Sequence, residues 1–290
     1  MTLFRSGTEV SDATIKEFEV QVVEAVDLRI TGIDGTHLNV DEFRGRGSRW
    51  TGGTIRDVGL VRADFDDARI KSVNLLHVKI AAGTARNVEI DDCRIEQTNF
   101  DLVIFSKARF GRVEFVETRF NKSSLDGARF AQCDLTSTHL TDADLTSVDF
   151  VGCTWERCNL SRSRLRRATF KKASGLVLTD AHVDGASFDE TNVAGISAAG
   201  AILVDASFRK GVVTGANFTG ANLNRAVMTD AVFTSCNFSG ADMTNARVKN
   251  SEVIGCLYDF STKLPLGMTE DQKSAMVFEA GDAAVPKSDG

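Results

Sequence analysis

Residues 141–170 read TDADL TSVDF VGCTW ERCNL SRSRL RRATF when divided into groups of five, and every group ends in a large apolar residue. The period extends in both directions. All 23 residues at positions divisible by five, from Leu60 to Phe170, are apolar. After a slip of three residues the period resumes at Leu178 and holds at 17 of 17 positions to Tyr258. Neither a helix nor a simple strand has this period, so the sequence predicts short straight sides, each followed by a turn.

The residue two places before each apolar centre is uncharged and mostly small, as at Ala63, Ala68 and Cys93. In an extended chain, residues two apart point to the same face. Each side is therefore predicted to bury one large and one small group, while the three remaining positions face water. The charged residues, such as Arg62 and Asp64, fall on those outer positions. This division is typical of a narrow solenoid.

Two units carry a resemblance to a known family: Ala216-Asn217-Phe218-Thr219-Gly220 and Ala143-Asp144-Leu145-Thr146-Ser147. They resemble the repeat of pentapeptide-repeat proteins, which reads roughly A(D/N)LXX, and the likeness covers about 200 of 290 residues. The resemblance implies an all-β fold, a right-handed quadrilateral parallel β-helix with four units per coil. Forty units then make about ten coils and a rod of roughly 50 Å.

Four units per coil place residues twenty apart in one column, so Phe110, Phe130, Phe150 and Phe170 are predicted to form a structural core stack. Of the 19 phenylalanines, 14 occupy apolar centres, which favours core packing over a ligand cage. A rod this thin leaves no room for a substrate cavity.

All six cysteines occupy the small inward position. Stacked neighbours would be close enough for a disulfide, but parallel side chains are poorly oriented for one. We therefore expect reduced, structural thiols, with no zinc spacing and neither a metal site nor a cofactor. The six are Cys93, Cys133, Cys153, Cys158, Cys236 and Cys256.

The chain is predicted to divide into five parts. Residues 1–54 are expected to form degenerate N-terminal coils that cap the rod, and 55–170 the first repeat block. Residues 171–177 hold the register break, interpreted as a bulge or kink, and 178–258 the second block. Residues 259–290 are expected to hold a C-terminal cap helix and a disordered tail.

Two motifs lie in this last part. Thr269-Glu270-Asp271-Gln272 predicts a capping box for a short helix reaching about Phe278. Tyr258-Asp259-Phe260-Ser261-Thr262-Lys263 resembles a tail common in the family, of the form YD-x-x-TK. Several members form a symmetric dimer through this end, which implies a homodimer for this chain.

A basic band precedes the register break, and it contains no acid. It is a candidate binding site for an acidic partner; the alternative is a solvated face whose charges pair across neighbouring coils. No aromatic residues are interleaved, so direct nucleic-acid binding is not expected. The band consists of Arg157, Arg162, Arg164, Arg166, Arg167, Lys171 and Lys172.

The sequence offers little support for catalysis. The four histidines are scattered, and no serine or cysteine is paired with a base at a recognisable spacing. The N-terminus has no secretory signal pattern and no stretch is apolar enough to span a membrane, so we expect a cytoplasmic protein.

Two functions remain open. The first is a non-catalytic scaffold that presents its flat faces to a protein partner, whose identity is unknown. The second, known in the family, is a DNA mimic that binds DNA gyrase and protects it from quinolones or toxins. A mimic needs an acidic face along the rod. Residues 55–258 contain 25 acidic and 25 basic side chains, and the net charge of -6 comes from the two ends.

Overall fold

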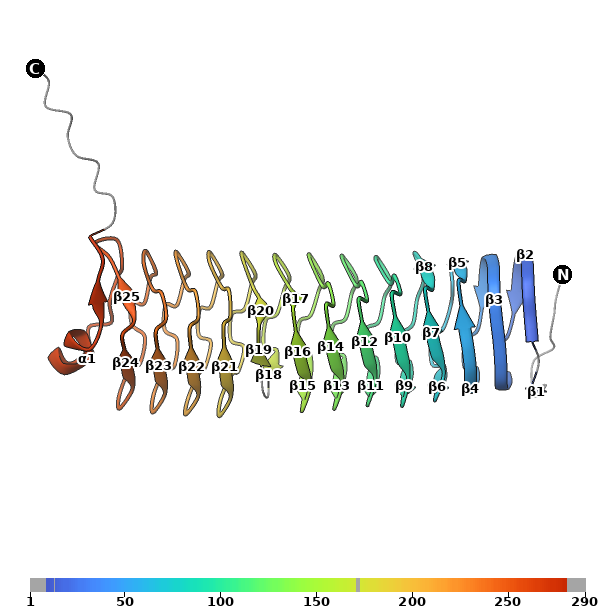
Figure 1. Ribbon diagram of the computed structural model, residues 1–290, viewed down its shortest axis with the longest axis horizontal. Helices are drawn as coiled ribbons and strands as arrows, with labels where there is room; N and C mark the ends of the chain where they lie inside the picture. Colours follow the sequence, from blue (N-terminus) through green and yellow to red (C-terminus); the bar gives the residue numbers. More distant parts are fainter. Residues whose placement is uncertain (1–8, 13, 171–172, 281–290) are drawn as a thin grey trace, which may run out of the picture.

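The computed structural model describes residues 9–12, 14–170 and 173–280, and it shows a single straight rod with β2 near one end and α1 at the other (Figure 1). Parallel strands wind into a β-solenoid of about 13 turns, followed by one short helix near the C-terminus. The predicted fold class is therefore confirmed. The rod is longer than the expected ten coils, because regular turns also form before residue 60.

The elements follow one another along the chain as β1 (Glu9–Ser11), β2 (Thr14–Glu24), β3 (Arg29–Arg44), β4 (Arg49–Arg56), β5 (Gly59–Val61), β6 (Arg69–Lys71), β7 (Asn74–Leu76), β8 (Lys79–Ala81), β9 (Glu89–Asp91), β10 (Arg94–Glu96), β11 (Arg109–Gly111), β12 (Glu114–Val116), β13 (Arg129–Ala131), β14 (Asp134–Thr136), β15 (Asp149–Val151), β16 (Thr154–Glu156), β17 (Cys158–Asn159), β18 (Thr169–Phe170), β19 (Ala173–Ser174), β20 (Leu176–Val177), β21 (Asn192–Ala194), β22 (Val212–Thr214), β23 (Val232–Thr234), β24 (Glu252–Ile254), β25 (Leu257–Tyr258), α1 (Glu270–Ser274) and β26 (Val277–Phe278).

One turn of the rod takes twenty residues. Phe110 of β11 pairs with Phe130 of β13, and Phe115 of β12 pairs with Leu135 of β14. Four five-residue units therefore complete each turn and give the rod four flat faces. We name them A, B, C and D after the consecutive units centred on Phe100, Phe105, Phe110 and Phe115, all four of which are buried.

The corners explain why the unit has five residues. At most corners one residue, two places after the apolar centre, adopts a left-handed backbone, as at Asp67 (φ 60°), Asp142 (φ 58°) and Gly152 (φ 66°). This conformation turns the chain, and Gly, Asn and Asp adopt it at the least cost. The sides between the corners are short parallel strands, whose N–H and C=O groups bond to the turns above and below.

The N-terminal turns keep the twenty-residue register, and on face B they exchange the large and small inward positions, whereas Ser48 and Trp50 keep the later order. Pairing begins at Glu9, which lies opposite Arg29. Phe43 and Gly45 are both buried, and a Cβ on Gly45 would lie 2.3 Å from the Phe43 ring. The large residue therefore precedes the small one in this turn, the reverse of the later order. This side still buries one large and one small residue, although their order is reversed.

The register break is a shortened turn. Cys158 pairs with Leu176 and Thr169 with Ser187, so both pairs are 18 residues apart instead of twenty. The core continues across it, because the rings of Phe170 and Phe188 stack with centroids 4.8 Å apart and planes 2° apart. The change that we interpret as a bulge or kink is thus a turn with two residues fewer, and Figure 1 shows the rod running straight through it.

The C-terminal cap closes the lumen. The predicted capping box is confirmed, since Thr269 accepts a hydrogen bond from the Gln272 backbone and Gln272 bonds back to the Thr269 backbone. The Gln272 amide also donates to the carbonyls of Val248 and Ser251, at 2.9 and 2.8 Å. Met268 and Met276 are buried over the core. The helix ends at Ser274 rather than near Phe278, because Val277–Phe278 instead pairs with β25.

Candidate interaction surface

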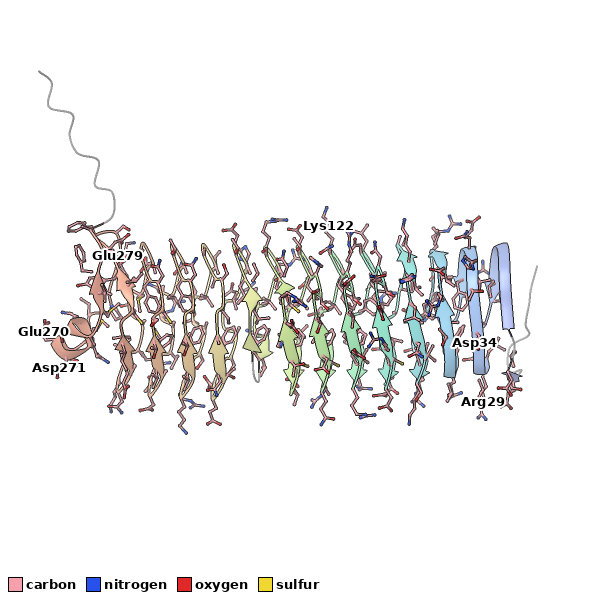
Figure 2. All side chains as sticks on the ribbon, in the orientation of Figure 1. Arg29, Asp34, Lys122, Glu270, Asp271 and Glu279 are labelled. Carbon is pink, nitrogen blue, oxygen red and sulfur yellow. The ribbon has the colours of Figure 1, made fainter. Side chains whose placement is uncertain are left out.

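The charged faces of the first block are columns of mixed sign, in which acids and bases of neighbouring turns form ion pairs. Glu89 lies between Arg69 and Arg109 on face C, at 3.0 and 2.9 Å from their guanidinium nitrogens. Asp92 similarly accepts from Arg112 at 2.6 Å, and this ion pair lowers the pKa of the Asp92 carboxyl. Residues twenty apart in the sequence stack on each other. An acid and a base at that spacing therefore form an ion pair with no net charge. Figure 2 shows such long side chains along the rod.

The basic band is largely engaged in the same kind of pair. Arg162 contacts Asp142 at 2.9 Å, Arg164 contacts Asp144 at 3.0 Å, and Arg166 contacts Asp184 at 2.6 Å. Arg157 contacts its neighbour Glu156 at 3.0 Å. Lys171 and Lys172 lie outside the described residues. A partner for this band therefore stays a prediction, and that partner would have to compete with the acids already present.

From Phe110 to Phe188 the interior is filled by aromatic rings, whereas an apolar cavity of about 140 Å³ remains in the turns before Phe110. Phe110, Phe130, Phe150 and Phe170 form one stack, with centroid distances of 4.5, 5.0 and 5.3 Å. Each ring is at most 1% exposed. The stack continues through Phe188, so no space is left there for a ligand.

The six cysteines are free thiols buried in the wall of the rod. Cys133 donates to the carbonyl of Phe110 at 3.4 Å, and Cys256 donates to that of Phe233 at 3.4 Å. Burial raises the pKa of the Cys93 thiol to about 11, which disfavours the reactive thiolate. These thiols act as small core groups that also satisfy backbone carbonyls.

A hollow of about 540 Å³ indents face A, lined by Asp101, Leu102, Arg119, Asn121, Lys122, His139, Thr141 and Asp142. Its charges are largely paired, since Arg119 contacts Asp101 at 2.8 Å and Asp142 contacts Arg162. Figure 2 shows one of the lining residues, Lys122, projecting from one edge of the rod.

Faces D and A lose their charged side chains over three turns of the second block. The three segments 191–200, 211–220 and 231–240 contain no Asp, Glu, Lys, Arg or His. The register places them one above another, since Asn192, Val212 and Val232 pair in succession on face D, and Ser197, Asn217 and Asn237 on face A. We call these thirty residues the neutral strip.

The strip is exceptional within this rod. In the first block the same two faces carry charges in each turn, for example Arg94, Glu96 and Asp101 in residues 93–102. In the second block, faces B and C keep theirs, for example Asp205, Arg209 and Lys210. The strip's outward groups are instead Ala, Val, Thr, Ser, Asn and Gly, and Val212 is 41% exposed.

Sequence reasoning missed the neutral strip because it weighed charge by block rather than by face. Each uncharged segment is only ten residues long and is followed by a charged one. The signal becomes visible once the residues after Leu178 are written in rows of twenty.

Exposed apolar side chains gather at the C-terminal end of the strip. The Phe278 ring contacts Phe260 and Tyr258, with centroids 4.6 and 5.3 Å apart. Phe260 is 78% exposed and Ile254 48% exposed. Figure 2 shows three acids, Glu270, Asp271 and Glu279, at this same end.

Among the described residues, no group of three or more His, Cys, Asp or Glu side chains is arranged to hold a metal ion. Within the same residues, no helix combines the length and apolar character needed to cross a bilayer.

Comparisons with known families fit this geometry. Residues 84–160 match the model of the pentapeptide repeat region, and residues 214–250 match that of pentapeptide repeats (8 copies). Both blocks of the chain therefore contain pentapeptide repeats. The family is generally a non-enzymatic structural fold. No curated protein sequence matches this pentapeptide-repeat chain.

Solved structures of pentapeptide-repeat proteins are among the structural matches. One is HetL, involved in heterocyst differentiation regulation in the cyanobacterium Nostoc sp. strain PCC 7120. It is 21% identical, and the match covers 70% of this chain and 88% of HetL with a TM-score of 0.47. Another is QnrB1, a plasmid-mediated fluoroquinolone resistance protein. It is 14% identical, with coverage of 90% and 91% and a TM-score of 0.30.

Proposed function

We propose that the protein is a non-catalytic scaffold that presents flat faces of its β-helix to a protein partner, with the neutral strip as the main docking face. The observation that carries the proposal is the absence of charge from thirty stacked residues of a rod that is charged elsewhere. Charged residues are depleted at the centre of protein interfaces, because their desolvation is costly. Small side chains on a flat sheet also allow close approach.

A charge placed on the strip tests this function. Thr214→Glu is suitable because Glu96 and Glu156 occupy the equivalent position in other turns, so the fold accepts an acid there. Thr229→Glu on face C is the matched control. We expect cross-linking in an extract of the native host to capture a defined set of proteins, which Thr214→Glu loses and Thr229→Glu keeps. Identical capture by both variants would contradict the proposal.

The proposal that the protein is non-catalytic rests on the contacts that its thiols and carboxylates make. The Cys133 thiol donates to a backbone carbonyl, and Asp142 and Asp144 are held by arginines. The Phe stack occupies the interior beside them. We further propose a cytoplasmic location, no cofactor, and no direct contact with nucleic acid.

The mixture of acids and bases on each face argues against a DNA mimic that binds gyrase. A mimic would present carboxylates along one face, whereas Glu89 and Asp92 are each held by arginines of neighbouring turns. Gyrase supercoiling in the presence of ciprofloxacin separates the two functions. The scaffold predicts no protection at stoichiometric excess of this protein; protection would favour the mimic instead.

The homodimer through the C-terminal end stays a prediction. The exposed rings of Phe260 and Phe278 favour it, whereas Glu270, Asp271 and Glu279 at the same end would repel their counterparts.

A further inference from the structure

We propose that the neutral strip is covered by the neutral strip of a second copy of this chain, with the two rods side by side. This inference rests on the proposed function, since it names the partner of the docking face. It differs from contact between the C-terminal ends, which would join the rods end to end.

The absence of charge restricts the partner. A partner that brought a charged side chain against the strip would leave that charge desolvated and without a counter-ion. The matching surface must therefore be uncharged over three consecutive turns. Within the described part of this chain, the strip itself meets this requirement, whereas its surroundings do not: Asp205 and Arg225 lie on face B, and Arg209 and Lys249 on face C.

The shape of the strip suits a two-fold contact. In a two-fold dimer the same patch meets itself, so the patch must be self-complementary in both charge and shape. A neutral patch does not repel its copy, and the parallel rows of face D (Asn192, Val212, Val232) give a flat surface with small groups. Val212, 41% exposed, lies in the middle row and offers an apolar contact point.

The size of the strip predicts the strength of the association. Rows about 4.8 Å apart on two adjoining faces give a patch of roughly 400 Å². Stable interfaces bury about 800 Å² per partner, so we expect a weak, concentration-dependent dimer. Ile254, which is 48% exposed and pairs with Thr234 of the strip, would extend it on face D.

Sedimentation equilibrium combined with small-angle X-ray scattering tests the proposal on the full chain. We expect a dimer whose cross-section is larger than that of one rod and whose length is close to that of one rod. Thr214→Glu on face D and Asn217→Asp on face A should each weaken the dimer at least about tenfold, because like charges would face each other. Thr229→Glu should leave the dissociation constant unchanged.

Two further variants identify the contact. A mixture of Thr214→Glu and Thr214→Lys chains should associate more tightly than either chain alone, since opposite charges then meet. Phe260→Asp, at the C-terminal end, should leave the side-by-side dimer in place. Asn217→Asp keeps the local turn, because an aspartate carboxylate accepts the equivalent bond at Asp144 and Asp242.

The proposal is overturned if the chain remains monomeric at concentrations up to about 1 mM. It is also overturned if the dimer is twice as long as one rod and is lost in Phe260→Asp but not in Thr214→Glu. A monomer that still captures host proteins through the strip would refute this inference and leave the proposed function standing. A monomer without strip-dependent capture would refute both.

Discussion

The carboxylate of Asp259 accepts a hydrogen bond from the backbone N–H of Gly240 at 3.0 Å, in the place of a backbone carbonyl. In the two preceding turns of face A, Gly200 donates to the carbonyl of Thr219 and Gly220 to that of Ser239. The same Asp259 oxygen accepts from the backbone N–H groups of Ser261 and Thr262. The tail motif thus ends the ladder by providing a side-chain acceptor for the last turn.

Removing this acceptor should loosen the last turn of face A. Asp259→Ala leaves the Gly240 amide with only the Thr262 hydroxyl, 3.1 Å away, and that hydroxyl also loses its own bond to Asp259. We therefore expect hydrogen exchange at Gly240 to accelerate at least about tenfold. Exchange at Gly200, two turns away, is the internal control because nearest-neighbour coupling dominates in solenoids. Unchanged protection of Gly240 would show that the motif does not terminate the ladder.

Acid should release the C-terminal cap before it unfolds the rod. Hydrogen bonds from the Ser261 side chain and the Gly240 backbone lower the pKa of Asp259 to about 2, and bonds from Thr244 and Lys263 lower that of Asp242 to about 2. A folded-state pKa below the ordinary value of 3.8 stabilises the fold above that pH, and the contribution is lost as the pH falls through about 2. NMR signals of Gly240 and Tyr258 should therefore shift between pH 4 and 2. Asp259→Asn should abolish most of the Gly240 shift.

The aromatic stack should be far more sensitive to substitution than the outer faces. Phe150 is fully buried between Phe130 and Phe170, so Phe150→Ala should cost about 3–5 kcal/mol of unfolding free energy. Arg164 is 60% exposed and contacts only one acid, so Arg164→Glu should change stability by no more than about 1 kcal/mol. Denaturant unfolding compares the two. A cost at Arg164 equal to that at Phe150 would contradict the assignment of inward and outward positions.

The N-terminal half of the lumen should accept a larger side chain. A cavity of about 140 Å³ is lined by apolar residues of the first turns, including Ile90, the neighbour of Phe110 in its column. Ile90→Phe would extend the Phe stack into this space and should raise stability by about 0.5–2 kcal/mol. Leu135→Phe, in a column where Phe115 and Trp155 already pack, is the control and should be neutral or destabilising. Thermal unfolding measures both.

The five-residue period was sufficient to predict the fold class and the columns. Phe130 and Phe150 lie in register because both obey the period, and Thr269 and Gln272 form the expected capping box. The N-terminal turns were harder to recognise. On one face there, Phe43 and Gly45 reverse the order of the large and the small inward residue, so the large residue falls out of the five-residue series.

The candidate surfaces depended on relations that a linear reading does not show. The sequence left open whether the band that contains Arg164 is free or pairs across neighbouring coils, and the fold places Asp144, twenty residues earlier, directly beside Arg164. The neutral strip was missed because Thr214 and Thr234 are neighbours only in the folded rod. Charge on a solenoid has to be counted by face.

The 18-residue turn has a consequence for how such a gene can change length. Losing two residues at a corner keeps all the remaining inward side chains inside, and so does adding a whole twenty-residue module. Losing one residue from a side would instead turn the following side chains outward. Recombination between the two blocks would therefore keep the rod continuous only if Thr169 is aligned with Ser187, its neighbour in the folded rod. An alignment that assumes a constant spacing of twenty residues would not. Corners are the sites at which insertions and deletions can accumulate while the rod stays continuous.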